Sequence, residues 1–79
     1  MSKNRKSDFE SYIMNRIREE RVRRGLSQND VADILNVSRG FIGQIESPNF
    51  SSKYSLDQIN EMAKELKCSP KDFMPDEPI

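Results

Sequence analysis

Residues that commonly carry out catalysis are scarce in this 79-residue chain. There is no His and one Cys, Cys68, which excludes imidazole chemistry, an intramolecular disulfide and a structural zinc site. The carboxylates are scattered, no glycine-rich phosphate loop is present, and no nucleophile has a neighbouring base. We therefore expect neither enzymatic activity nor a cofactor. The chemistry that remains is non-covalent recognition.

Two side chains suited to recognition are Arg39 and Gln44. An Arg guanidinium can donate two parallel hydrogen bonds to guanine O6 and N7, and a Gln carboxamide can pair with adenine N6 and N7. Each such pair discriminates against the wrong base by about 1–3 kcal/mol. The alternative for both residues is an ordinary solvent-exposed polar face.

Between them lie two glycines, Gly40 and Gly43, within one turn of an expected helix. Each glycine destabilises a helix interior by about 0.8–1.0 kcal/mol relative to Ala. Either bare backbone approaches bases or sugars closely at these positions, or neighbouring packing needs the room. In both cases glycine removes potential reading side chains, so we expect modest sequence specificity with a large backbone and shape component.

The elements that must position these residues are all helical, because Gly and Pro are few and no apolar run alternates with period two. We expect helices at about 8–24, 28–35, 39–47 and 56–67, with a fifth helical turn starting at Pro70. The apolar stripes of the first and fourth helices are Phe9, Tyr12, Ile13 and Ile17, and then Leu56, Ile59, Met62, Ala63 and Leu66. The expected N-caps are Ser7, Ser27, Ser38, Ser55 and Ser69.

The short helices at 28–35 and 39–47 are joined by a tight turn at Asn36, which tolerates a left-handed backbone. Ala32 allows a close helix crossing, and the other inward positions are Val31, Leu35, Val37, Ile42 and Ile45. That pattern leaves Arg39, Gly40, Gly43, Gln44 and Ser47 on the opposite face of the second helix of the pair.

The segment GLSQNDVADILNVSRGFIGQIE, residues 25–46, resembles the helix-turn-helix of phage Cro and repressor proteins, the Xre family. The resemblance extends over about residues 12–74. It implies a compact five-helix, lambda-repressor-like DNA-binding domain with a central helix-turn-helix, usually working as a homodimer on a pseudo-palindromic operator. Helix 39–47 would enter the major groove of double-stranded DNA and contact bases through Arg39, Gly40, Gly43 and Gln44.

The resemblance also implies the residues that contact phosphate. Gln28 matches a family position that contacts phosphate and braces the recognition helix, with a plain cap-region residue as the alternative. Ser27 and Ser38 are primarily caps that can add a hydroxyl contact. The full expected set is Ser27, Gln28, Ser38, Ser47, Lys53 and Tyr54, the last two in a loop that is otherwise a solvated connector.

Five further residues are considered mainly for structural roles. Arg21 and Glu46 match family positions that resemble an ion pair between the first and third helices. Phe41 departs from the family's usual small polar residue, and either packs beside Ile45 or contacts a thymine methyl group. Glu20 also departs, since an apolar residue is frequent there. Cys68 is expected to pack in the core rather than act in redox chemistry.

The formal net charge is zero, but the charges are segregated. Residues 1–24 carry eight Lys/Arg against four Asp/Glu, whereas residues 56–79 carry three against six. We expect a basic, flexible arm at 1–7 that contains Lys3, Arg5 and Lys6, a domain at 8–74 with its motif at 28–47, and a short acidic, Pro-containing tail at 75–79. No apolar run is long enough for a membrane span or signal peptide, so we expect a cytoplasmic protein without a membrane or small-molecule partner.

The leading hypothesis is a sequence-specific transcriptional regulator that acts as a repressor. The alternative is a protein-interaction module, such as an antitoxin or controller-like component, whose acidic C-terminal third docks a basic partner. The neutral overall charge favours the alternative, whereas the motif favours the regulator.

Overall fold

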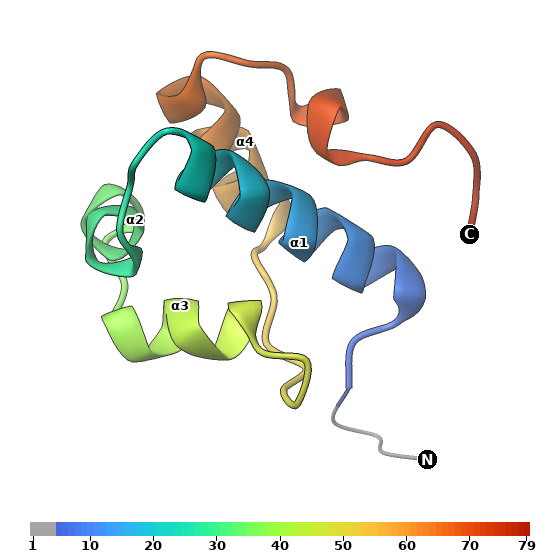
Figure 1. The fold of residues 1–79 in the computed structure, drawn as a ribbon, viewed down its shortest axis with the longest axis horizontal. Coiled ribbons are helices and arrows are strands. Elements are labelled where there is room, and N and C mark those ends of the chain that lie inside the picture. The colour runs from blue at the N-terminus through green and yellow to red at the C-terminus, as the bar shows by residue number, and fades with distance from the viewer. Residues whose placement is uncertain (1–4) are drawn as a thin grey trace.

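The computed structural model describes residues 5–79 and contains no strand in that range. Its elements are the α-helices α1 (Asp8–Arg23), α2 (Gln28–Leu35), α3 (Arg39–Glu46) and α4 (Leu56–Leu66), and the 3-10 helix η1 (Pro70–Phe73) (Figure 1). The all-helical class is confirmed, but the fifth helix is a single 3-10 turn. Pro75 explains this, because a proline disfavours helical backbone at the preceding residue, and Met74 is indeed extended. No described helix has the length and apolar character needed to cross a membrane.

A serine precedes every helix, and its hydroxyl oxygen accepts a backbone N–H from the first turn. At four of the five starts the third helical residue returns a hydrogen bond to the serine N–H; these residues are Glu10, Asp30, Gln58 and Asp72. Such caps each stabilise a helix start by about 0.5–2 kcal/mol. The predicted N-caps are therefore confirmed.

Three helix ends adopt a left-handed backbone. Gly25 follows α1 with φ 74°, and Asn36 and Lys67 end α2 and α4 with φ 56° each. The left-handed turn at Asn36 was predicted and is confirmed. Lys67 was not predicted there, because a lysine carries no local preference for this conformation.

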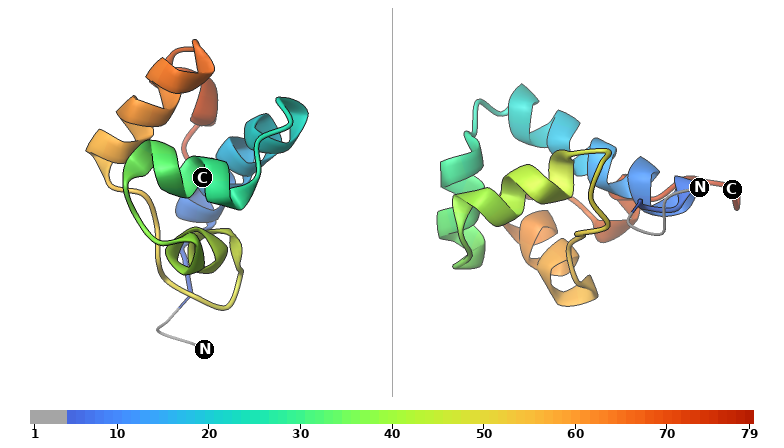
Figure 2. Two further views of the ribbon diagram at one scale, coloured as in Figure 1. Left: turned by 90° about the vertical axis from the view of Figure 1, so that its left-hand side faces the viewer. Right: turned by 90° about the horizontal axis from the view of Figure 1, so that it is seen from below.

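The helices pack around one core, with α1 between α3 on one side and η1 on the other (Figure 1). Figure 2 shows α2 and α3 packed against each other at one end of the molecule. The buried apolar residues are Ile13, Met14, Ile17, Val31, Ala32, Ile42, Ile45, Tyr54, Ile59, Met62, Ala63, Leu66 and Phe73.

The predicted apolar stripes are wrong at three residues near the starts of α1 and α4. Leu56 is 80% exposed, and Phe9 and Tyr12 are exposed as well. Leu56 and Phe9 lie in the first turns of α4 and α1, and helical spacing fixes the face of a residue but not how far its neighbours extend over it. Met14 and Tyr54 fill the core instead.

Candidate nucleic-acid interface

Helix α3 has one buried face and one face open to solvent. Ile42 and Ile45 pack into the core, as predicted. Arg39, Gly40 and Gln44 are exposed on the other side, and Gly43 and Ser47 are half-buried. The structure thus brings the residues expected to contact bases onto one accessible surface, which we call the α3 outer face (Arg39, Gly40, Gly43, Gln44 and Ser47).

The two glycines on this face have no packing reason to be glycine. A Cβ added at Gly40 would lie 4.0 Å from Ser38 Oγ, and one at Gly43 would lie 3.9 Å from Gln28 Oε1. Both are ordinary contact distances, and neither glycine has a positive φ. Intramolecular crowding therefore does not explain them, and the close approach of a ligand to bare backbone stays a prediction.

A hydrogen-bonded carboxylate fixes α3 to the rest of the domain. Glu46 accepts from Arg21 Nε at 2.8 Å and from Arg21 Nη2 at 2.9 Å. Arg21 Nη1 also donates to the Leu26 carbonyl at 2.8 Å, which ties the α1–α2 connection to the same group. With side-chain exposures of 11% and 5%, this bidentate pair is largely shielded from water.

Gln28 joins this arrangement from the start of α2. Its Nε2 donates to Glu46 Oε1 at 3.0 Å, so α1, α2 and α3 all meet at one carboxylate. This contact fits the bracing role implied by the resemblance. The phosphate contact of Gln28 stays a prediction.

The serine hydroxyls that are expected to contact phosphate form helix N-caps in the structure. The Ser27 oxygen accepts from Asp30 N at 3.0 Å and the Ser38 oxygen from Phe41 N at 3.1 Å. Both serines are exposed. A hydroxyl that accepts at oxygen can still donate its hydrogen, so a cap and a phosphate contact are compatible.

The two residues of the loop after α3 that are expected to contact phosphate, Lys53 and Tyr54, differ in exposure. Lys53 is exposed, and its ammonium lies 3.3 Å from Glu10 Oε2. Tyr54 is only 4% exposed, and its hydroxyl is buried without a hydrogen-bond partner. Burial raises the pKa of this phenol well above its ordinary value. Its expected phosphate contact does not fit this position, because the side chain is directed into the core.

Lys6 is predicted to lie in a flexible arm, but in the structure it docks on the end of α3 and is a functional candidate. Its ammonium donates to the carbonyl oxygens of Ser47 at 2.8 Å, Phe50 at 2.7 Å and Gln44 at 3.4 Å. Two of these carbonyls belong to the end of α3, where helix carbonyls lack partners and attract cations. Burial, and then the charge of Lys53, lower the pKa of Lys6. Lys3, in the same predicted arm, lies outside the described residues.

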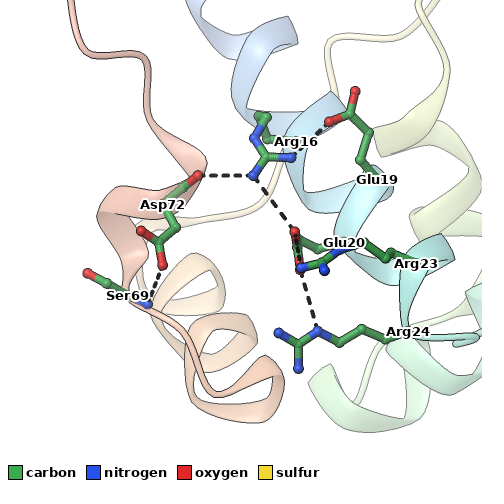
Figure 3. Close-up of polar contacts among 7 residues, drawn as sticks. All are labelled: Arg16, Glu19, Glu20, Arg23, Arg24, Ser69 and Asp72. Carbon is green, nitrogen blue, oxygen red and sulfur yellow. Dashed lines mark hydrogen bonds and ion pairs between the residues drawn. The ribbon is translucent and has the colours of Figure 1, made fainter.

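A cluster of arginines around Glu20 explains why a carboxylate occupies this position, where an apolar residue is frequent (Figure 3). Arg23 Nη2 donates to both carboxylate oxygens, at 2.7 and 2.8 Å. Arg24 Nε and Arg16 Nη2 lie 3.4 and 3.8 Å away. These contacts, led by the hydrogen bond from Arg23, lower the pKa of Glu20. Arg16 also donates to the Asp72 carbonyl at 3.4 Å, so the cluster faces η1 rather than α3.

Two residues with open roles pack against the core. Phe41 is half-buried beside core residues, which fits packing rather than a thymine contact. Cys68 is half-buried as well, and burial raises the pKa of its thiol. A raised pKa suppresses the reactive thiolate, in keeping with a packing role. Within residues 5–79 no cluster of three metal-binding side chains occurs.

Comparison with known protein families agrees with the helix-turn-helix arrangement of α2 and α3. The profile of the HTH_3 helix-turn-helix family matches residues 17–73, which include α2, α3 and the Arg21–Glu46 pair. The chain belongs to this helix-turn-helix family. The resemblance to Xre-type proteins is therefore confirmed. No curated protein sequence matches the chain.

Solved structures similar to this helix-turn-helix domain include restriction-modification controllers. The controller C.AhdI from Aeromonas hydrophila is 28% identical, with a TM-score of 0.68 over 85% of this chain and 97% of its own. The controller C.Esp1396I, solved with a 19 base pair DNA duplex, is 27% identical, with a TM-score of 0.68 over 85% of this chain and 87% of its own. An HTH_3 family transcriptional regulator from Vibrio cholerae is 32% identical, with a TM-score of 0.66, and the match covers 82% of this chain but 35% of that longer one.

Proposed function

We propose that this helix-turn-helix domain binds double-stranded DNA with α3 in the major groove and thereby regulates transcription, acting by binding rather than by catalysis. The observation that carries the proposal is the α3 outer face, which is open to solvent, bare at two glycines and mounted on a helix fixed by Glu46. An α-helix fits the major groove, where base edges are distinguishable. The similar controller C.Esp1396I was solved bound to a 19 base pair DNA duplex, which supports double-stranded DNA as the ligand.

The proposed roles divide by chemistry. Arg39 and Gln44 read base edges, whereas Gly40 and Gly43 let the backbone approach the duplex closely. The proposed phosphate contacts come from Ser27, Gln28, Ser38, Ser47 and Lys53. Because few side chains read bases, much of the affinity comes from backbone and shape contacts.

The proposed working unit is a homodimer that acts as a repressor on a pseudo-palindromic operator. One copy offers a single α3 outer face, and two copies related by a two-fold axis would read half-sites about one DNA turn, roughly 34 Å, apart. Selection of bound sequences from a random duplex pool tests this. The expected product is an inverted repeat bound by two copies, and a single unpaired half-site bound by one copy would contradict it.

A second, narrower candidate is a restriction-modification controller. The similarity to C.AhdI favours it, since it covers 97% of that protein. If this chain is such a controller, the selected operator will occur in its own genome beside restriction and methyltransferase genes. An operator found only elsewhere would argue against this narrower role and leave DNA binding intact.

The test of DNA binding is its salt dependence. Affinity for selected and random duplexes should be measured by fluorescence anisotropy at several salt concentrations. Each neutralised phosphate should contribute about −0.9 to the slope of log affinity against log salt. Undetectable binding, or an affinity that does not change with salt, would exclude the proposal.

A further inference from the structure

The carboxamide of Gln44 is hydrogen-bonded to the loop that follows α3. Ser52 Oγ donates to Gln44 Oε1 at 3.0 Å. Gln44 itself is exposed, whereas Ser52 is half-buried. A base-reading side chain is thus oriented by a residue that lies outside the recognition helix.

The loop that carries Ser52 is itself anchored on both sides. Before Ser52, Lys6 donates to the Phe50 carbonyl at 2.7 Å and to the Ser47 carbonyl at 2.8 Å. After it, Lys53 lies 3.3 Å from Glu10 Oε2. Lys6, which precedes α1, and Glu10, in its first turn, therefore contact the loop on both sides of Ser52, so the hydroxyl of Ser52 is positioned before any ligand arrives. Such preorganisation reduces the ordering cost of binding.

A carboxamide has one acceptor oxygen and one nitrogen with two donors. A paired contact with adenine requires both, with the oxygen accepting from N6 and the nitrogen donating to N7. The oxygen has two lone pairs, and Ser52 occupies one of them, so both NH2 hydrogens but only one lone pair of Gln44 remain for a base. Guanine presents two acceptors in the major groove, O6 and N7, and no donor.

We propose that Ser52 is a specificity-determining residue, which holds Gln44 as a hydrogen-bond donor and so directs it to guanine instead of the adenine that a free glutamine favours. The inference rests on the proposed DNA binding and deepens it, because it names the base class read at one position. Ser52 acts through Gln44 and is a positioning residue; it does not itself contact the base.

The experiment is selection of bound duplexes by four variants beside the unmodified protein. Gln44→Ala identifies the base pair that Gln44 reads, as the position where preference disappears. Ser52→Ala should shift preference at that same position from guanine toward adenine by about fivefold or more, the lower limit for a paired contact. Ser52→Thr, which keeps the hydroxyl, should retain guanine.

Ser51→Ala is the matched control, since it removes a neighbouring hydroxyl that makes no contact with Gln44. Thermal unfolding by circular dichroism checks that each variant is folded. An unchanged base preference in Ser52→Ala, or an equal shift in Ser51→Ala, overturns the inference while leaving DNA binding established. If the unmodified protein binds no duplex, the proposed function fails and this inference fails with it.

Discussion

At the scale of single residues, Arg39 is the side chain from which the clearest change in specificity is expected. Removing its guanidinium in Arg39→Ala should relax base preference at one position, at a cost of about 1–3 kcal/mol for the preferred sequence. Selection of bound duplexes and titration of the selected site measure both quantities.

Two other variants serve as comparisons for Arg39→Ala. Outside the base pair read by Gln44, Lys53→Ala should weaken binding to all sequences alike and reduce the salt slope by about 0.9, since a phosphate contact carries no sequence information. Lys64→Ala removes an exposed cation from α4 and should leave both properties unchanged. A loss of base preference in Lys64→Ala would mean that the assay reports general charge.

The glycines of α3 give a prediction in which stability and binding move in opposite directions. Ala at Gly40 or Gly43 meets no atom closer than 3.9 Å. Each substitution should therefore raise the free energy of unfolding by up to about 1 kcal/mol, or the melting temperature by about 4–8 °C. The same methyl group should weaken DNA binding, because it lies where the duplex approaches.

Thermal unfolding and anisotropy titration of the two glycine variants test this pair of effects. Unimpaired binding by both would show that bare backbone is not used at the interface. Reduced stability would show that the glycines are needed for the fold.

At the scale of elements, the position of α3 depends on Glu46. Glu46→Ala leaves the Arg21 guanidinium buried without its partner, and halving a buried pair costs about 3–5 kcal/mol. Urea unfolding should show this loss, and DNA affinity should fall for every sequence because the whole helix is displaced. Glu19→Ala breaks an exposed pair with Arg16 and should cost less than about 1 kcal/mol. Equal losses in the two variants would contradict the bracing role.

The elements also show what could be predicted from the sequence. The helix starts follow from short-range hydrogen bonds, since a serine followed three residues later by a Glu, Asp or Gln carries the information locally. The two faces of α3 follow from helical spacing. These patterns were sufficient for the helical fold and for the exposed face of α3 that is proposed to read bases.

The errors concern contacts between distant parts of the chain. Tyr54 lies in a serine-rich loop and has the residue type of a phosphate ligand, yet it fills a gap in the core. Lys6 is 41 residues from Ser47, and no local pattern indicates that its ammonium caps α3. The hydrogen bond from Ser52 to Gln44 was likewise not predicted, because the two residues meet only after the loop folds back.

At the scale of the whole molecule, acid stability depends on the paired carboxylates. Arg23 and its neighbours lower the pKa of Glu20 below its ordinary value of 4.5. A carboxylate with a depressed pKa in the folded state stabilises the fold at neutral pH. That stabilisation declines as the pH falls below 4.5 and is lost once the pH passes the lower, folded-state pKa.

Glu20→Gln should therefore reduce stability at neutral pH and flatten the loss of stability below about pH 4.5. Melting temperatures measured between neutral pH and strongly acidic pH test this expectation. Glu19→Gln, on the exposed side of the same helix, should follow the acid profile of the unmodified protein more closely. A Glu20→Gln profile that falls as steeply as the unmodified one would show that other carboxylates dominate.

The docking of Lys6 on the end of α3 has a practical consequence for any labelled or fused form of the protein. A purification tag or fluorophore joined at the N-terminal side would be connected through Lys6, which docks next to the α3 outer face that is proposed to contact DNA. Ile79, by contrast, ends the chain away from α3 (Figure 1). Attachment at Ile79 therefore keeps a label away from the α3 outer face.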